Sequence, residues 1–328
     1  MSAASASDRR PPRVSIGLPT YNRADRLARA IDSALGQTFR DIELVISDNG
    51  STDGTEALCG EHARRDARVR YMRQPVNRGP IANFNAVIDA LEGEYALLLA
   101  DDDWLDADYV ERCLAELQAN PGLALVGGLA RYFDQDGNVV RDGLEVTLVE
   151  DDPVARVRHY LGRVDDNGIF YGLCRREALQ RAAPMHDVLG SDWLLIAGIV
   201  FGGKAKTVRS TTVNRSMGGT SRTTEQILRT MSNVARLERR MPFLYTACTA
   251  FADIAWKSEA YGDVGPVRRF GMAARMAPSA MRWKGSAWLV LGPPLLRLLQ
   301  KPAGRWLQRP FEWALRRLGI TPTELPPL

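Results

Sequence analysis

Three consecutive aspartates, Asp101, Asp102 and Asp103, directly follow the uninterrupted apolar run 95–100 and precede Trp104. This pattern predicts a buried strand that ends in a cluster of carboxylates. Carboxylate oxygens are the ligands that hard cations such as Mg²⁺ and Mn²⁺ prefer. A cation held there could bridge a diphosphate and neutralise the charge that develops as it departs. The alternative is a solvated acidic loop, and the apolar strand before the run makes that alternative the weaker one.

Three further apolar runs, 14–18, 42–47 and 69–72, predict strands that alternate with helical patterns. This alternation predicts an α/β fold, a Rossmann-like, mostly parallel sheet with helices on both faces. Ligands bind such sheets beyond the carboxyl ends of the strands. Polar residues follow the strands there: Thr20, Tyr21, Asn22, Arg23, Asp48, Asn77, Arg78 and Gly79. Among them, Asp48 is placed to accept hydrogen bonds from a base or a ribose.

Later segments predict further elements around this sheet. Residues 123–129 and 170–174 are expected to be strands, and residues 134–138 form a hairpin-turn signal. Ser191 is expected to cap a helix that covers residues 192–201. From Thr223 onward the pattern is helical, so a helical C-terminal region should follow the sheet.

Composition excludes several classes of protein. The four cysteines are far apart and the three histidines form no HExxH pair, which argues against a zinc site or a disulfide framework and fits a cytoplasmic protein. Residues 1–12 have no apolar core and are expected to be a disordered leader. No apolar stretch is long enough to span a membrane; the nearest, 287–299, is short and contains Pro293, Pro294 and Arg297.

The charge is unevenly distributed along the chain. From Pro266 onward there are eleven basic and two acidic residues, although the whole chain carries only +4. Within residues 284–318, arginines and lysines are interleaved with tryptophan, phenylalanine and leucine, as in helices that lie on anionic lipid. The alternative is a helical cap on the sheet with a basic outer face. No nucleic-acid-binding module is visible, so we expect no nucleic-acid partner.

At this point the sequence resembles a known family. The segments VSIGLPTYNR (14–23), SDNGSTDGT (47–55), NRG (77–79) and ADDDW (100–104) resemble successive signatures of the family 2 inverting glycosyltransferases, which have the GT-A fold. The likeness covers roughly residues 13–223, and the four motifs are specific together in this order. It implies a nucleotide-binding half, about 13–103, an acceptor half, about 104–223, and a helical, basic C-terminal region, 224–328.

The resemblance implies roles for individual residues. The residues that would bind the nucleotide-sugar donor are Pro19, Thr20, Tyr21, Arg23, Asp48, Asn77, Arg78, Asp101 and Arg215. Asp48 would hydrogen-bond the base, Asp101 would face the ribose, and Arg78 would lie near the diphosphate. Asp102 would bind Mn²⁺ or Mg²⁺, with Asp103 supporting the metal shell.

The acceptor half carries the reactive groups that the resemblance implies. Asp192 matches the general base that removes the proton of the attacking hydroxyl, although it could instead only stabilise a helix N-terminus. Asn167, Tyr171 and Trp193 lie where such enzymes admit the acceptor, and the two aromatic residues could equally be core. Met217 stands where the family often has a histidine near the metal; a thioether is a poor ligand for these cations, so metal dependence is less secure than donor binding.

Together these features indicate a glycosyltransferase that moves a sugar, with UDP as the commonest nucleotide, to a glycan or lipid-linked acceptor. It would act in bacterial-type polysaccharide, glycolipid or glycoconjugate synthesis, in the cytoplasm and on the inner face of the cell membrane. A dinucleotide-dependent dehydrogenase needs a glycine-rich turn after the first strand, and residues 18–21 are not one. A sugar nucleotidyltransferase would need an early glycine-rich loop with a lysine. The remaining alternative is a catalytically idle nucleotide-sugar-binding or scaffold protein.

Overall fold

A computed structural model of the chain describes residues 10–163, 166–217 and 242–282. Within these ranges one sheet of ten strands forms the centre of the molecule, in the order β3-β2-β1-β4-β9-β6-β10-β5, with β7 on β6 and β8 on β10. The first four strands run parallel to one another: β1 (Val14–Thr20), β2 (Ile42–Asp48), β3 (Val69–Arg73) and β4 (Tyr95–Leu98). The expected α/β, mostly parallel sheet is therefore present.

The second half of the sheet is mixed. β9 (Leu173–Arg175) lies antiparallel between β4 and β6 (Leu123–Phe133), and β6 is parallel to β10 (Lys204–Ser216). The remaining strands are antiparallel to their neighbours: β5 (Trp104–Leu105), β7 (Val139–Asp142) and β8 (Thr147–Leu148). Gly137, with φ of 83°, allows the tight turn between β6 and β7, at the predicted hairpin signal.

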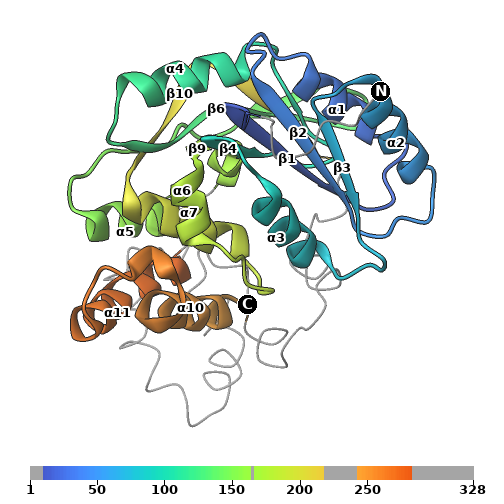
Figure 1. Ribbon diagram of the computed structural model, residues 1–328. Coiled ribbons are helices and arrows are strands. Elements are labelled where there is room, and N and C mark those ends of the chain that lie inside the picture. The colour runs from blue at the N-terminus through green and yellow to red at the C-terminus, as the bar shows by residue number, and fades with distance from the viewer. Residues whose placement is uncertain (1–9, 164–165, 218–241, 283–328) are drawn as a thin grey trace, which may run out of the picture.

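Helices cover both faces of the sheet, as expected (Figure 1). One face carries α1 (Leu27–Leu35), α2 (Thr55–Arg65) and α4 (Tyr109–Ala119), and Gln37 joins α1 to α4 by accepting a hydrogen bond from the Val110 N–H at 2.9 Å. The other face carries α3 (Pro80–Ala90), α6 (Arg176–Ala182) and α7 (Ser191–Gly202). This alternation leaves the carboxyl ends of the parallel strands uncovered.

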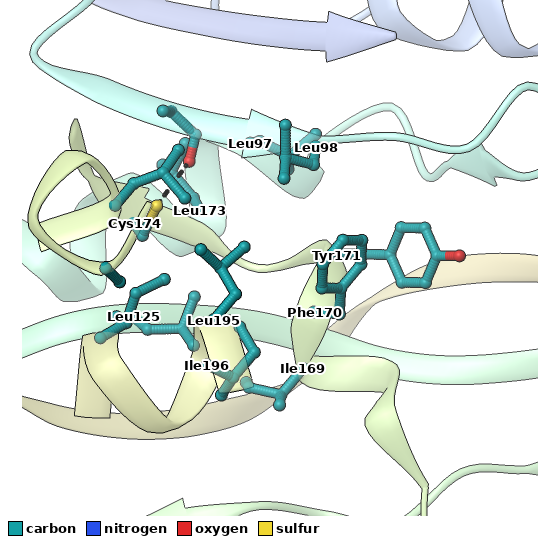
Figure 2. Close-up of a cluster of buried hydrophobic side chains, with 14 of the residues drawn as sticks. Leu97, Leu98, Leu125, Ile169, Phe170, Tyr171, Leu173, Cys174, Leu195 and Ile196 are labelled. Carbon is teal, nitrogen blue, oxygen red and sulfur yellow. Dashed lines mark hydrogen bonds between the residues drawn. The ribbon is translucent and has the colours of Figure 1, made fainter. Parts of the chain in front are cut away.

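The core between the two halves of the sheet is apolar (Figure 2). Leu97 on β4, Leu125 on β6 and Leu173 on β9 pack there with Leu195 of α7, and all are at most 2% exposed. Burying a leucine side chain contributes about 1.5–3 kcal/mol, so the packing of β9 against its neighbours joins the halves firmly.

Several sequence-based boundaries were wrong; the strand expected at 123–129, for example, extends to Phe133. The strand expected at 170–174 is instead a 3₁₀ helix, η2 (Asn167–Tyr171), followed by β9; the Asp166 side chain accepts the Gly168 N–H and starts the helical turn. The strand expected at 95–100 ends at Leu98. Ser191 does not cap α7: the N-cap is Gly190, whose φ of 80° is a left-handed conformation that glycine adopts without strain.

The described C-terminal segment is helical. It comprises α10 (Pro242–Ala252), a π-helix η3 (Asp253–Lys257), a short 3₁₀ helix η4 (Glu259–Tyr261) and α11 (Pro266–Arg282). These elements pack on α5 (Pro153–Arg163) and α7 (Figure 1), and Leu194 of α7 meets Ala250 and Ala277 in one apolar cluster. The basic segment 284–318 lies outside the described residues. Among the described helices, none is long and apolar enough to cross a membrane.

Candidate active site

A cleft with a volume of about 1360 Å³ opens beyond the carboxyl ends of β1 and β4. Its walls contain many of the predicted site residues: Pro19, Thr20, Tyr21, Arg23, Asn77, Asp101, Asp102, Asp103, Tyr171 and Arg215, together with Met217. The other predicted site residues, Asp48, Arg78, Asn167, Asp192 and Trp193, lie outside this lining. The parallel sheet thus brings residues from distant motifs to one place, as the strand-end pattern predicts.

The three aspartates of the acidic run differ in their surroundings. Asp101 lies 3.5 Å from Arg23, and Asp103 accepts the Ser216 N–H at 2.8 Å and lies 3.4 Å from Arg215. Burial and the neighbouring charge of Asp102 raise the pKa of Asp101 to about 6. Burial also raises the pKa of Asp103, against the opposing charge of Arg215. Two of the three carboxylates therefore already face an arginine.

Asp102 is the carboxylate best suited to a cation. It lines the cleft, is partly exposed, and makes no hydrogen bond or ion pair with the described residues. Nowhere in the described part of the chain do three acidic, histidine or cysteine side chains converge as a metal-binding group. Met217, 43% exposed, lines the cleft nearby. A cation here would depend on Asp102, on a shared Asp103, and on oxygens from outside the protein.

The predicted nucleotide end of the cleft rests on a hydrogen-bonded loop framework. Asp48 is fully buried: it accepts the Ser51 N–H at 2.8 Å and the Tyr71 hydroxyl at 2.9 Å. Asn49 donates to Asn77 at 2.9 Å and accepts the Arg78 N–H at 3.0 Å. These contacts fix the loops after β2 and β3 where they border the cleft.

Asn22 was expected among the strand-end polar residues but was given no role, and Asn83 of α3 was not predicted. Asn22 has φ of 53°, and its side chain accepts the Thr52 N–H at 2.8 Å, which stabilises this left-handed conformation at the cleft wall. Asn83, buried on α3, donates to the carbonyls of Thr20 at 3.2 Å and Ser47 at 3.0 Å. Asn83 thereby ties β1 to β2 directly under the cleft.

Arg215 organises the opposite wall. Its guanidinium donates to the hydroxyls of Tyr132 at 2.9 Å and Tyr171 at 3.2 Å, and its Cζ lies 4.7 Å from the Tyr171 ring centroid. In Figure 2 the Tyr171 hydroxyl points away from the apolar cluster around Phe170. Tyr171 is thus both a buried side chain and part of the cleft wall.

Asp192 lies in the first turn of α7, partly exposed and close to this wall. Asn167 donates to its carboxylate at 2.7 Å, and the Tyr160 hydroxyl donates to Asn167 at 2.6 Å. The Tyr160 ring stacks on Trp193 at 5.3 Å between centroids, which makes Trp193 a core residue, 5% exposed. Burial raises the pKa of Asp192, while the Asn167 hydrogen bond and the charge of Arg215 oppose this rise.

The β6–β7 hairpin supplies residues that sequence reasoning missed. The cleft lining includes Tyr132, Asp134, Gln135, Asp136, Val140 and Arg141 from this hairpin. Behind them, the buried Asp166 accepts a hydrogen bond from Tyr132 and one from Arg141 at 2.8 Å. Only the turn signal at 134–138 marked this segment, and a turn by itself does not identify a cleft wall.

The α/β sheet, with a large polar cleft beyond its strands, places the chain in the class of α/β ligand-binding proteins. Residues 15–187 match the family described as Glycosyl transferase family 2, and this match covers more than half of the chain. The chain therefore belongs to glycosyl transferase family 2, and the expectation of a glycosyltransferase is confirmed at the level of the family. Asp192 and Arg215 lie beyond the matched segment.

Curated relatives share part of the chain. Chondroitin synthase of Escherichia coli is 39% identical over 139 residues, 42% of this chain and 20% of that protein. Hyaluronan synthase of Pasteurella multocida is 39% identical over 134 residues, 41% of this chain and 14% of that protein. A Campylobacter jejuni GalNAc(5)-diNAcBac-PP-undecaprenol beta-1,3-glucosyltransferase is 27% identical over 182 residues, 55% of this chain and 57% of that protein. The chain thus corresponds to a fifth or less of the two synthases.

Solved structures share the fold. S. aureus TarS 1–349 in complex with UDP-GlcNAc has a TM-score of 0.59 and 15% identity, covering 84% of this chain and 75% of that one. At this identity the likeness shows the fold alone. It confirms the expected GT-A-like architecture.

Proposed function

We propose that the chain transfers a sugar from a nucleoside diphosphate sugar to an acceptor hydroxyl with inversion at the anomeric carbon. The acceptor oxygen forms a bond to that carbon, the nucleoside diphosphate leaves with the electron pair of the broken C–O bond, and Asp192 takes the hydroxyl proton. The observation that carries this proposal is the cleft that holds the acidic run, Arg215 and Tyr171 of η2. Asn167, at the other end of η2, donates to Asp192 at 2.7 Å. A base whose pKa is raised by burial is a stronger proton acceptor once ionised.

In this proposal the donor lies along the edge of β1, β2 and β4. Pro19, Thr20, Tyr21, Arg23 and Asn77 line that part of the cleft. Asp48 and Arg78, outside the lining, would act at the nucleotide end, with Asp48 engaged by Ser51 and Tyr71. Asp101 faces the ribose, and Arg215 meets the diphosphate. UDP is the first nucleotide to test, because the structure of TarS was solved with UDP and UDP-GlcNAc.

A divalent cation, Mn²⁺ or Mg²⁺, fits the oxygen-rich acidic run, with Asp102 as its protein ligand and Asp103 in support. When bound, it would neutralise charge on the diphosphate. The partly exposed carboxylate of Asp102 supports this role, whereas Asp103 already interacts with Arg215 and Ser216. Asp102→Asn should therefore weaken Mn²⁺-dependent UDP binding at least tenfold and leave metal-free binding nearly unchanged; calorimetric titration with and without Mn²⁺ measures both.

The test of the whole proposal is a binding and turnover screen of nucleotide sugars. UDP-sugars are titrated into the purified full chain, and release of UDP is then followed with glycan and lipid-linked acceptors. Asp192→Asn should slow transfer by about 10²-fold or more and leave donor affinity unchanged. Transfer that survives this substitution would mean that another group is the base.

The alternative is a nucleotide-sugar-binding protein without catalytic activity. One observation favours it: Asp192 lies outside the cleft lining and is partly buried. It predicts that UDP-sugars bind and that neither the wild type nor Asp192→Asn releases UDP. The same screen therefore separates an enzyme from a binding protein.

We further propose polysaccharide, glycolipid or glycoconjugate synthesis as the setting, with a glycan or lipid-linked acceptor. The C. jejuni relative is named for an undecaprenol-linked substrate, which supports testing such acceptors. The acceptor would approach between Tyr171 and Asn167. Residues 284–318 would hold the protein peripherally on an anionic membrane surface on the cytoplasmic side.

A further inference from the structure

Arg141 on β7 is a cleft residue with no part in the roles proposed above. Its guanidinium carbon lies 3.8 Å from the centroid of the Tyr132 ring, and its Nη1 donates to Asp166 at 2.8 Å. The Arg141 side chain is 49% exposed, whereas that of Asp166 is 6% exposed. A buried carboxylate thus anchors a cation whose other side faces the cleft.

This anchoring orients the guanidinium before any ligand arrives. Asp166 is itself fixed, because it accepts the Tyr132 hydroxyl and, at 3.0 Å, the Gly168 N–H. The hydrogen bonds of Arg141 to Asp166 and to the Asp142 carbonyl both start from Nη1. The rest of the planar fork is therefore left to bind a carboxylate or phosphate, the groups that match its geometry.

Through Asp166 and Tyr132, Arg141 is connected to the part of the cleft near Asp192, the proposed base, and Arg215, the proposed diphosphate contact. Asp166 directly precedes Asn167, whose amide donates to Asp192 at 2.7 Å. Arg141 also shares the Tyr132 ring with Arg215, whose Cζ is 5.2 Å from the ring centroid. The nucleotide-binding loops after β1 and β3 form a different part of the lining.

The acidic side chains of the same hairpin do not pair with this cation; that of Asp142 binds Arg131 at 2.9 Å. Asp134 uses its oxygens within its own turn, where it accepts the N–H groups of Asp136 and Asn138 at 2.9 and 2.8 Å. Asp136 lines the cleft with an exposed side chain. Its carboxylate is solvated, so water screens its charge strongly.

We propose that Arg141 binds an anionic group of the acceptor, a carboxylate or a phosphate close to the sugar that presents the attacking hydroxyl. This proposal rests on the proposed function and adds the chemical class of the acceptor to it. The stacked, anchored guanidinium selects for a planar or tetrahedral oxyanion, and neutral acceptors forgo this contact.

The test compares three glycosides that differ in one group: methyl β-D-glucuronide, methyl β-D-glucoside 6-phosphate and neutral methyl β-D-glucoside. Each is titrated into the full chain, with and without saturating UDP, by ligand-observed NMR. At least one anionic glycoside should bind about tenfold or more tightly than the neutral one, which is the scale of one charge-assisted hydrogen bond. Whichever anion binds better shows whether the source is a carboxylate or a phosphate.

Substitutions assign the preference to Arg141. Arg141→Gln should remove it, Arg141→Lys should keep only part of it, and Arg131→Gln, the same change on the same hairpin but outside the cleft lining, should leave it intact. Because Arg141→Gln leaves the buried Asp166 without its cation, the double variant Arg141→Gln/Asp166→Asn, which keeps the pair neutral, is tested beside it. A preference lost in both variants supports the proposal.

Three results would overturn it. The first is equal binding of neutral and anionic glycosides by the wild type, and the second is a preference that survives Arg141→Gln. The third is the absence of binding by both anionic glycosides. Failure of UDP to bind would instead contradict the proposed function, and the titrations without nucleotide would still report on Arg141.

Discussion

Burial raises the pKa of Asp192, the proposed base, and Asn167 is among the groups that oppose this rise. Its amide donates to the Asp192 carboxylate and thereby opposes the rise in pKa that burial causes. Asn167→Ala should raise the pKa of Asp192 further. Because the base must be ionised, the acidic limb of the pH–rate profile should move to higher pH. Initial transfer rates measured between pH 5 and 9, roughly the range that spans a raised carboxyl pKa, check this.

Tyr160→Phe is the matched control, since it removes the hydroxyl that orients the Asn167 amide but leaves the amide in place. It should shift the profile in the same direction by a smaller amount. An unchanged acidic limb in Asn167→Ala would indicate that Asp192 is not the group that titrates.

The raised pKa of Asp192 also makes the folding stability depend on pH. Since burial raises the pKa of Asp192 in the folded chain, the folded state keeps this proton to higher pH than the unfolded state does. The contribution of Asp192 to folding stability therefore falls as pH rises from its usual pKa through the raised one. Asp192→Asn should flatten this part of the stability curve, which urea unfolding at several pH values measures.

At the residue scale, the sequence predicted site residues best where a polar or charged side chain lies at the end of a predicted strand. Thr20, Arg23 and Asp101 follow apolar runs, and the sheet brings them to one cleft. Asn83 and Arg141 were missed for a physical reason: each acts through partners far along the chain, such as the Thr20 carbonyl for Asn83 and Asp166 for Arg141. Local periodicity carries no information about such contacts.

At the scale of elements, the segment before α7 is held from two sides. Asn85 of α3 exchanges two hydrogen bonds with the Met185 backbone, at 2.8 and 2.9 Å. From the C-terminal helices, Thr246 donates to the Leu189 carbonyl at 3.0 Å, and Asp253 pairs with His186 at 2.7 Å. The start of α7, and with it Asp192, is therefore positioned by α3, which borders the cleft, and by C-terminal helices whose described residues do not line it.

Thr246→Val tests this positioning, because it keeps the side-chain shape and removes the buried hydrogen bond to Leu189. One such bond contributes about 1 kcal/mol, so transfer should slow by up to roughly fivefold while UDP affinity is unchanged. Steady-state kinetics separate the two effects, because slower transfer lowers kcat and weaker donor binding raises the donor KM.

Ser258→Ala serves as the control within the same helical unit. Ser258 caps η4 by accepting the Ala260 N–H, and it does not touch the segment before α7. It should lower the melting temperature without lowering kcat. If Thr246→Val and Ser258→Ala lower kcat equally, the C-terminal helices affect transfer only through the overall stability of the fold.

The elements themselves were predictable to different degrees. Long apolar runs fixed the positions of β1, β2 and β6, because their side chains are buried along nearly their whole length. The short run near Phe170 was misassigned, since a strand and a helical turn of five residues have the same apolar content. The difference came from Asp166, whose side chain bonds to the backbone two residues on.

At the scale of the whole molecule, the C-terminal region combines packed helices with a basic segment. Residues 242–282 pack on α5 and α7, while the membrane prediction and its alternative, a helical cap, both concern 284–318, which lies outside the described residues. Deletion from Lys284 onward should leave UDP affinity unchanged and remove binding to vesicles that contain anionic lipid. Vesicle sedimentation at low and high salt measures this, since screening weakens such binding.

A full-length variant with Arg297, Lys301, Arg305 and Arg309 all changed to glutamine is the matched control. It should lose most of the salt-sensitive part of vesicle binding while keeping the aromatic residues. Unchanged vesicle binding after the deletion would contradict the membrane prediction and favour the cap alone.

The place of β9 in the sheet bears on how the protein is made. β9 joins β4 to β6, yet it is translated after both of them. While the ribosome works through the intervening residues, β4 keeps an unpaired, apolar edge, the kind of surface to which other nascent chains and chaperones bind. The sheet closes only after Leu173–Arg175 has left the exit tunnel. Premature termination before that point would therefore leave this edge of β4 without its partner strand.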